Sequence, residues 1–120
     1  GSQIINDISF DNGSITFNND AAKYVFDNKI ALEICPTSNV QCGAYSNVSE
    51  HSFGELHKAG FNVTINTDNR LMSDITMSEE VSNVAESFGL DEKDILSITK
   101  NTIEAGFVES NLRTELLKKL

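Results

Sequence analysis

Hydrophobic and polar residues alternate in two short segments near the start of the chain. Ile8-Ser9-Phe10 and Ile15-Thr16-Phe17 flank the polar segment Asp11-Asn12-Gly13-Ser14. The pair Asn-Gly favours the positive φ angles of tight turns, so the two segments predict a β-hairpin. The next apolar residues recur at helical spacing after several polar residues suited to an N-cap, which predicts a short helix from about Ala21 to Asn28.

The middle of the chain carries two strand patterns with a helical pattern between them. Ile30 to Cys35 is a mostly apolar run typical of a buried strand, and Pro36 is expected to end it. Residues 61–66 alternate between apolar and polar side chains and predict a second strand. The segments that remain are expected to form a polar loop over residues 37–48, a helix over residues 50–58 capped by Ser49, and a second polar loop over residues 67–75.

The last third of the chain predicts three amphipathic helices. Thr76-Met77-Ser78-Glu79 is a capping box, and the apolar stripe after it predicts a helix that ends at Gly89. Asp91 is expected to cap the second helix, and Ser110 or Asn111 the third. The acidic residues of these helices are expected to face solvent. The packed face of the second helix is expected to comprise Leu96, Thr99, Ile103 and Phe107.

The order of these elements predicts an α/β fold. A strand, a helix and a second strand form a βαβ unit, in which the two strands are parallel. A sheet of only two parallel strands has two open edges, and the three helices carry more apolar surface than so small a sheet can cover. We therefore expect residues 1–120 to form a single partial domain of a larger architecture. We also expect its open sheet edges to promote self-association.

Composition narrows the classes of partner. Among 120 residues, 18 are Asp or Glu and 9 are Lys or Arg, which gives a net charge of −9. This charge argues against binding to nucleic acid or to an anionic membrane surface. Cys35 and Cys42 match neither a CxxC motif nor a zinc ribbon, so we interpret them as reduced thiols. The sequence shows no secretory signal pattern, and we expect a cytoplasmic protein.

The candidate chemistry lies where the two predicted strands end, because βα proteins gather ligands at the carboxyl ends of their strands. Cys35 to Asn39 follows the first strand, and Asn66 to Asn69 follows the second. A carboxylate placed just beyond a buried strand needs a partner. Asp68 is therefore a candidate metal ligand or general base, and the alternative is that it caps a turn.

Several ordered motifs resemble the adenosine deaminase family. They begin with Leu32-Glu33-Ile34-Cys35-Pro36-Thr37-Ser38-Asn39 and Gly43-Ala44, and continue with Val63-Thr64-Ile65-Asn66-Thr67-Asp68. Phe88-Gly89-Leu90 and Asn101-Thr102-Ile103-Glu104-Ala105-Gly106-Phe107 follow in the same order. The resemblance implies the C-terminal segment of a (β/α)8 TIM barrel, here two parallel βα units with an N-terminal hairpin and extra C-terminal helices. It also implies a zinc hydrolase that converts the purine nucleoside adenosine to inosine and ammonia.

The resemblance assigns roles to two residues. Asp68 matches the zinc-ligating Asp at the end of the family's last barrel strand. Asn69 matches the next position, where the family pattern has a second Asp that contacts the purine, so Asn69 is a candidate substrate-binding residue. Asn can exchange hydrogen bonds with a ring nitrogen, but it carries no negative charge, and the preference for adenosine over another aminopurine stays open.

Other catalytic groups of the family have no counterpart in this sequence. The family's remaining zinc ligands, its catalytic Glu and its catalytic His all precede the matched region. His51 and His57 do not follow a predicted strand, and we expect both to lie at the surface or in helix packing. One carboxylate does not make a catalytic Zn²⁺ site, so we assign no catalytic residue and expect the chain alone to be inactive. The alternative is a stand-alone, non-catalytic protein-interaction module derived from this fold.

Overall fold

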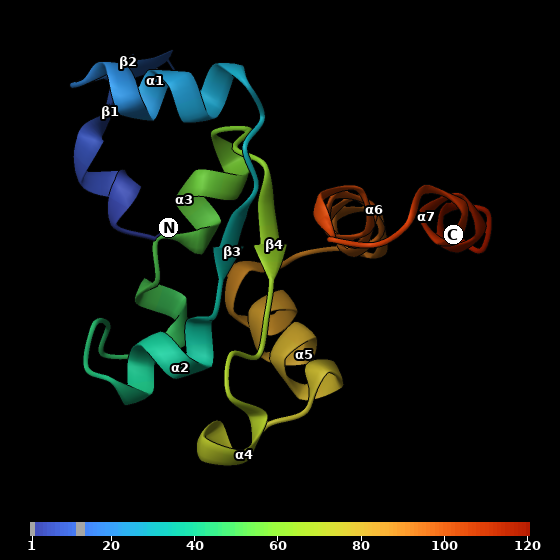
Figure 1. Ribbon diagram of the computed structural model, residues 1–120. Coiled ribbons are helices and arrows are strands. Elements are labelled where there is room, and N and C mark those ends of the chain that lie inside the picture. The colour runs from blue at the N-terminus through green and yellow to red at the C-terminus, as the bar shows by residue number, and fades with distance from the viewer. Residues whose placement is uncertain (1, 12–13) are drawn as a thin grey trace.

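The computed structural model describes residues 2–11 and 14–120. Helices surround one small parallel sheet, and a hairpin lies at the N-terminal end (Figure 1). In chain order the elements are η1 (Ser2–Asp7), β1 (Ile8–Asp11), β2 (Ser14–Phe17), α1 (Asp20–Asp27), β3 (Leu32–Ile34), α2 (Pro36–Gln41), η2 (Val48–Glu50), α3 (Phe53–Lys58), β4 (Val63–Ile65), α4 (Arg70–Ser73), α5 (Met77–Phe88), α6 (Glu92–Ala105) and α7 (Ser110–Leu117).

The N-terminal hairpin and the first helix form where the sequence predicts them. β1 and β2 pair antiparallel, with Ile8 opposite Phe17. The Asn12-Gly13 pair on which this prediction rests lies outside the described residues. Asn19 caps α1, because its Oδ1 accepts a hydrogen bond of 2.8 Å from the Ala22 amide. These contacts confirm both elements.

The central strands are parallel, as the βαβ order predicts. Leu32 of β3 lies opposite Val63 of β4, and Ile34 lies opposite Ile65. Both strands are shorter than the predicted segments. All three residues of β4 are buried, including Thr64, whereas β3 alternates and leaves Glu33 exposed. The two strands therefore have different surroundings on the face that Glu33 and Thr64 share.

Three predictions between the strands and after them are correct only in part. Residues 37–48 are not all loop, because Pro36 occupies the first turn of helix α2, where its fixed φ angle and missing N–H are tolerated. The helix expected over residues 50–58 is divided at His51 into η2, capped by Asn47, and α3. The polar loop expected over residues 67–75 contains the single turn α4.

The three C-terminal helices are confirmed, but the predicted packed face of α6 is not fully confirmed. Capping boxes start α5 at Thr76 and α6 at Asp91. Ile95 and Ile98 of α6 pack against the core. Of the residues expected on this face, Thr99 and Ile103 are half-buried and Leu96 is exposed, whereas Phe107 lies beyond Ala105, where α6 ends, and is exposed. The predicted face is therefore correct only in part. Helix α6 packs against β4, and α7 lies on the far side of α6 from the sheet (Figure 1).

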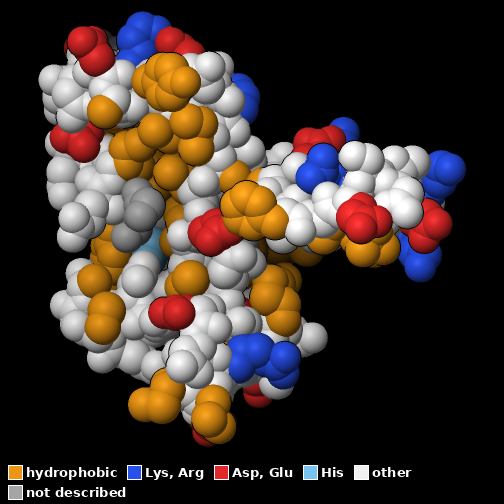
Figure 2. Space-filling view, viewed as in Figure 1, with side chains coloured by type: hydrophobic (Ala, Val, Ile, Leu, Met, Phe, Trp, Pro, Cys, Tyr) orange, Lys and Arg blue, Asp and Glu red, His pale blue; other side chains and the backbone are white. Residues whose placement is uncertain are grey.

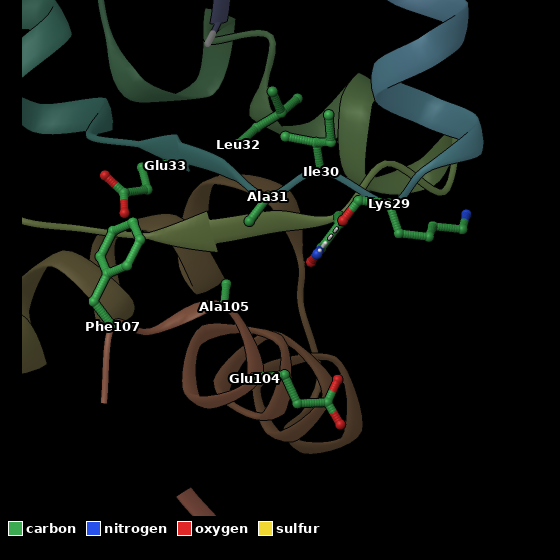
Figure 3. A pocket seen from close by; sticks show the side chains of 9 residues that line it. Lys29, Ile30, Ala31, Leu32, Glu33, Glu104, Ala105 and Phe107 are labelled. Carbon is green, nitrogen blue, oxygen red and sulfur yellow. Dashed lines mark hydrogen bonds between the residues drawn. The ribbon is translucent and has the colours of Figure 1, made fainter. Parts of the chain in front are cut away.

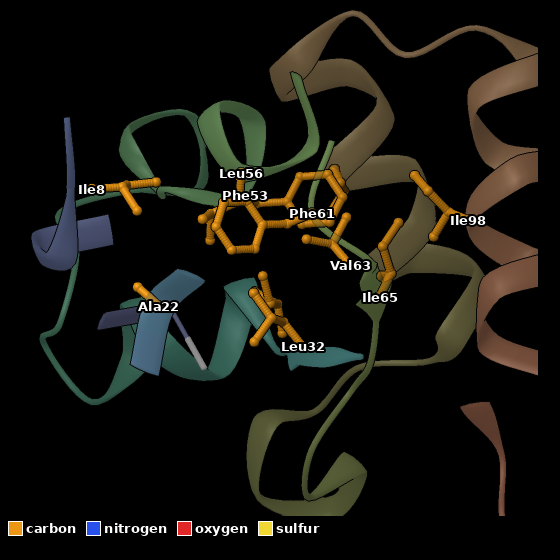
Figure 4. Close-up of a cluster of buried hydrophobic side chains, with 11 residues drawn as sticks. Ile8, Ala22, Leu32, Phe53, Leu56, Phe61, Val63, Ile65 and Ile98 are labelled. Atoms are coloured by element: carbon orange, nitrogen blue, oxygen red, sulfur yellow. The ribbon is translucent and has the colours of Figure 1, made fainter. Parts of the chain in front are cut away.

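One hydrophobic core joins the hairpin, the sheet and the helices (Figure 4). Phe53 and Leu56 of α3 are completely buried between the strands and the N-terminal elements. Phe17, Phe26 and Phe61 form a ring cluster beside them, with centroids 4.9 to 6.5 Å apart. This contact between edges and faces of aromatic rings fixes α1 and the hairpin against the sheet.

Some large apolar side chains remain at the surface. Figure 2 shows hydrophobic side chains at the end of the molecule occupied by α4, whose Leu71 and Met72 are both strongly exposed. Among the described residues, no helix combines the length and the hydropathy needed to span a membrane.

Candidate functional site

The carboxyl ends of β3 and β4 point to the region where α2, α4 and α5 meet (Figure 1). Pro36 starts α2 only two residues after Ile34, the last residue of β3. At the end of β4, the Asn66 amide donates to the Ile34 carbonyl at 2.9 Å and extends the parallel pairing by one residue. The segment that contains Asp68 and Asn69 therefore leaves the sheet directly beside the first turn of α2.

Asp68 lies at the centre of this region. Its φ angle is +57°, in the left-handed region that Asp tolerates better than most residues. Its side chain is exposed, and Oδ2 accepts a hydrogen bond of 2.7 Å from the Ser38 hydroxyl of α2. The two segments that the sequence analysis selected, 30 residues apart in the chain, are thus in direct contact.

Asn69 has a local structural role. Its Oδ1 accepts a hydrogen bond of 3.3 Å from the Met72 amide and caps α4. The cap that the sequence analysis considered for Asp68 is thus provided by Asn69. The two neighbouring side chains therefore make different contacts: Asn69 caps α4, whereas Asp68 contacts α2.

Sequence reasoning missed Glu80, which is completely buried although the acidic residues of α5 were expected to face solvent. Its Oε1 accepts a hydrogen bond of 2.9 Å from the Thr37 amide in the first turn of α2. A signal was present in the sequence: Glu80, Val84 and Phe88 recur every fourth residue and therefore share one face of the helix. Val84 is also completely buried, so this face is the packed one.

Cys35 lies beside this cluster and is free. Burial raises the pKa of its thiol, and the carboxyl groups of Asp68 and Glu80 raise it further. The thiol therefore stays protonated at neutral pH, which makes Cys35 a poor metal ligand or nucleophile without a further partner.

His51 is buried, with only 2% of its surface exposed, so it is not the surface residue that the sequence allowed. Its Nδ1 accepts a hydrogen bond of 2.9 Å from the Phe53 amide, which leaves the hydrogen on Nε2 to donate to Asn39 Oδ1 at 2.9 Å. Burial lowers the pKa of His51 to about 4. Its ring also packs on Tyr45, with centroids 4.1 Å apart, and joins α2 to α3.

His57 has the helix-packing role that the sequence predicts. It lies in the last turn of α3, its ring stacks on Phe53, and its Nε2 is 3.6 Å from Asp94 Oδ1 of α6. Neither histidine approaches Asp68 through any described contact.

The donor set does not by itself fit a zinc ion. A carboxylate oxygen such as that of Asp68 is a suitable zinc ligand, but catalytic sites use three protein ligands. Across residues 2–11 and 14–120, no group of three or more His, Cys, Asp and Glu side chains is arranged to hold a metal. The described residues therefore provide one candidate ligand and no complete metal centre.

A groove of about 830 Å³ runs elsewhere, between the open edge of β3 and the C-terminal end of α6 (Figure 3). Residues 29–33 form one wall, and Glu104, Ala105 and Phe107 form the other. Phe107 is fully exposed beside Glu33 (Figure 3). Neither Asp68 nor Ser38 lines this groove, so it is separate from the site at the strand ends.

Comparison with known proteins decides the family. The family model described as adenosine deaminase matches residues 2–120. The chain belongs to the adenosine deaminase family. A relative named adenosine deaminase from Mycobacterium tuberculosis (strain ATCC 25618 / H37Rv) is 40% identical over 121 residues, which cover 100% of this chain and 33% of the relative. Another, from Shewanella halifaxensis, is 44% identical over 99 residues, which cover 82% of this chain and 30% of the relative.

Solved structures of related deaminases share the fold. Adenine deaminase from Arthrobacter aurescens is 19% identical, with a TM-score of 0.78 over 84% of this chain and 31% of that chain. The N6-methyl-AMP deaminase from Arabidopsis thaliana is 26% identical, with a TM-score of 0.72 over 83% of this chain and 30% of that chain. This chain therefore spans about a third of the length of the family members that it matches.

Proposed function

We propose that this chain is the C-terminal segment of a (β/α)8-barrel adenosine deaminase and contributes to the zinc-dependent hydrolytic deamination of adenosine to inosine. The observation that carries the proposal is the placement of Asp68 directly after a buried parallel strand and within hydrogen-bond distance of Ser38. Adenosine is the favoured substrate because the relatives at 40–44% identity are named adenosine deaminase. Residues 1–120 form one partial domain in this proposal.

Two residues have assigned roles in the intact enzyme. Asp68 provides one oxygen ligand to Zn²⁺, and Asn69 contacts the purine after its side chain is released from, or shared with, the α4 cap. The other zinc ligands and the groups that move protons come from parts of the barrel outside this segment. Purine binding has support in the family, since the solved structures similar to this chain include Arabidopsis ADAL complexed with GMP and with IMP. Free Cys35 and Cys42 support a reducing, cytoplasmic location.

The proposal predicts that the 120-residue chain alone does not turn over adenosine, because a single carboxylate cannot hold a catalytic zinc ion. The measurement is inosine formation in a zinc-supplemented assay, together with zinc binding by calorimetry. When the chain is joined to the preceding two thirds of a deaminase, Asp68→Ala is expected to abolish zinc retention and turnover. Ser49→Ala, an exposed change away from the strand ends, is the matched control. Turnover by the isolated chain, or full zinc retention by the Asp68→Ala enzyme, contradicts the proposal.

We also propose that the isolated chain self-associates. The outer edge of β3 has no neighbouring strand among the described residues, and the groove beside it exposes the ring of Phe107. An unpaired strand edge next to apolar surface is a template for another strand. A second copy is the available occupant when the rest of the barrel is absent.

A further inference from the structure

We propose that Ser38 is a positioning residue that holds the side chain of Asp68 in one orientation, and that Glu80 holds the helix that carries Ser38. This inference rests on the proposed role of Asp68 as a metal ligand and names the residues that prepare it for that role. The sequence analysis did not select Glu80, and the resemblance assigned no role to Ser38.

The contact between Ser38 and Asp68 leaves one carboxylate oxygen available. The Ser38 hydroxyl donates to Oδ2 at 2.7 Å, and Oδ1 has no hydrogen-bond partner among the described residues. Asp68 is exposed and lies in the short connection between β4 and α4, so without this contact its side chain would sample several rotamers. A ligand fixed in advance loses less conformational freedom when it binds a metal. Oδ1 would therefore be the oxygen left to bind a metal in the intact enzyme.

Ser38 is itself placed by an unusual contact. Helix α2 has six residues, and its N-cap residue Cys35 provides no side-chain hydrogen bond. The Thr37 amide is among the first amides of the helix, which have no acceptor within it. Glu80 of α5 accepts this hydrogen bond at 2.9 Å and thus caps α2 from another element.

The burial of Glu80 costs free energy that its single hydrogen bond does not offset. Its Oε2 has no hydrogen-bond partner, and no described Lys, Arg or His forms an ion pair with it. A well-packed apolar side chain at this position would avoid the cost of burying a polar group. We infer that Glu80 is retained because it fixes the first turn of α2, one residue before Ser38.

A second contact aligns α2 with the segment after β4. The Gln41 side chain donates to the Ser73 carbonyl at 3.0 Å. Ser38 and Gln41 are three residues apart and share one face of α2. Together they hold both ends of the segment from Asp68 to Ser73, so the orientation of Asp68 depends on the orientation of α2.

The test uses the 120-residue chain and measures the χ1 rotamer of Asp68 from three-bond NMR couplings of its carboxyl carbon. In the unaltered chain we expect one dominant rotamer. Ser38→Ala is expected to give averaged couplings, and Ser38→Thr, which keeps the hydroxyl, is expected to restore them. Glu80→Met is expected to average the couplings and to make amide exchange of Thr37 roughly tenfold faster. Glu80→Gln, which keeps an acceptor, is expected to preserve both. Ser49→Ala is the matched control for the loss of an exposed hydroxyl.

Two outcomes would overturn the inference. One is a Ser38→Ala chain whose Asp68 couplings equal those of the unaltered chain. The other is a Ser38→Ala chain in which the amide shifts of β3 and β4 change as much as those of Asp68, which would make Ser38 a general structural residue. The proposed function fails separately, because Asp68 can be fixed by Ser38 in an enzyme whose zinc content does not depend on Asp68.

Discussion

His51 shows how a single buried side chain can set the pH dependence of stability. Its two ring nitrogens are both used in hydrogen bonds that require the neutral imidazole. Protonation would remove the acceptor for the Phe53 amide and place a charge in a buried site. The sequence analysis expected His51 to lie at the surface or in helix packing. In the structure, its hydrogen bonds join α2 to α3.

We expect the free energy of unfolding to fall as pH decreases from about 7 to about 5. The pKa of His51 is lowered from 6.5 to about 4 in the folded chain, so the unfolded chain binds the proton first. The stabilisation is complete above the unfolded pKa and is lost progressively below it, by up to ~1.4 kcal/mol per pH unit. Urea unfolding at several pH values measures this slope.

Two variants distinguish the contribution of His51 to this pH dependence from that of other titrating groups. His51→Gln is expected to be less stable at pH 7 and to have a flatter profile between pH 7 and pH 5 than the unaltered chain. His57→Gln is the matched control and is expected to keep the slope. An unaltered chain that is equally stable at both pH values would show that His51 does not have this role.

Among the glycines that the structure describes, Gly54 of α3 has the closest neighbour, the ring of Phe88 in α5. A Cβ atom added at Gly54 would lie 2.5 Å from Cδ1 of the Phe88 ring. Phe88 is half-buried and its ring also packs on Phe53, with centroids 5.5 Å apart, which limits how far the ring can move away. We expect Gly54→Ala to destabilise the chain by ~1–3 kcal/mol, measured by urea unfolding.

The matched control for Gly54→Ala is a change at the next residue of α3. Glu55→Ala changes an exposed residue of α3 and is expected to alter the free energy of unfolding by less than ~0.5 kcal/mol. Adding Phe88→Leu to Gly54→Ala is expected to cost less than the sum of the single changes, because the smaller side chain removes the clash. Strict additivity of the two changes would mean that the ring and the helix do not limit each other.

The elements that the sequence predicted correctly are those with local signals. Capping boxes at Thr76 and Asp91, and Gly89 with its left-handed φ of 65°, specify helix ends without reference to the rest of the molecule. Helix α2 was missed because Pro36 both ends a strand and suits the first turn of a helix, and the acceptor that caps this helix comes from Glu80, 43 residues later. Which face of α6 is buried depends on the position of β4, and the sequence pattern of the helix alone does not contain that information.

For the candidate site, the sequence predicted the position of Asp68 and Asn69 but not their contacts. The strand pattern places both residues at a carboxyl end, and the family motif gives Asp68 its expected role. The hydrogen bond from Ser38 depends on the parallel register of β3 and β4 and on the start of α2. Those features are set by tertiary packing, so they could not be predicted from the local pattern.

At the scale of the whole molecule, the open edge of β3 predicts association. We expect light scattering to show a concentration-dependent increase in mass, because a second copy can cover the edge and the groove beside it. Ala31→Pro, at the edge, is expected to reduce this association, since proline removes an edge amide. Ala21→Pro, in the first turn of α1, is the matched control and is expected to have no such effect. A monodisperse monomer of the unaltered chain at high concentration would contradict the prediction.

The bond between Ser38 and Asp68 has a consequence for how the chain acquires its site. The two residues are 30 positions apart, and the intervening chain contains α2, α3 and β4. Closing that loop has an entropic cost that is recovered only when the intervening elements have packed. The site therefore cannot assemble ahead of the central βαβ unit, and any opening of that unit dismantles it. The stability of the site therefore depends on the cooperative folding of the whole βαβ unit, and not on the Ser38–Asp68 hydrogen bond alone.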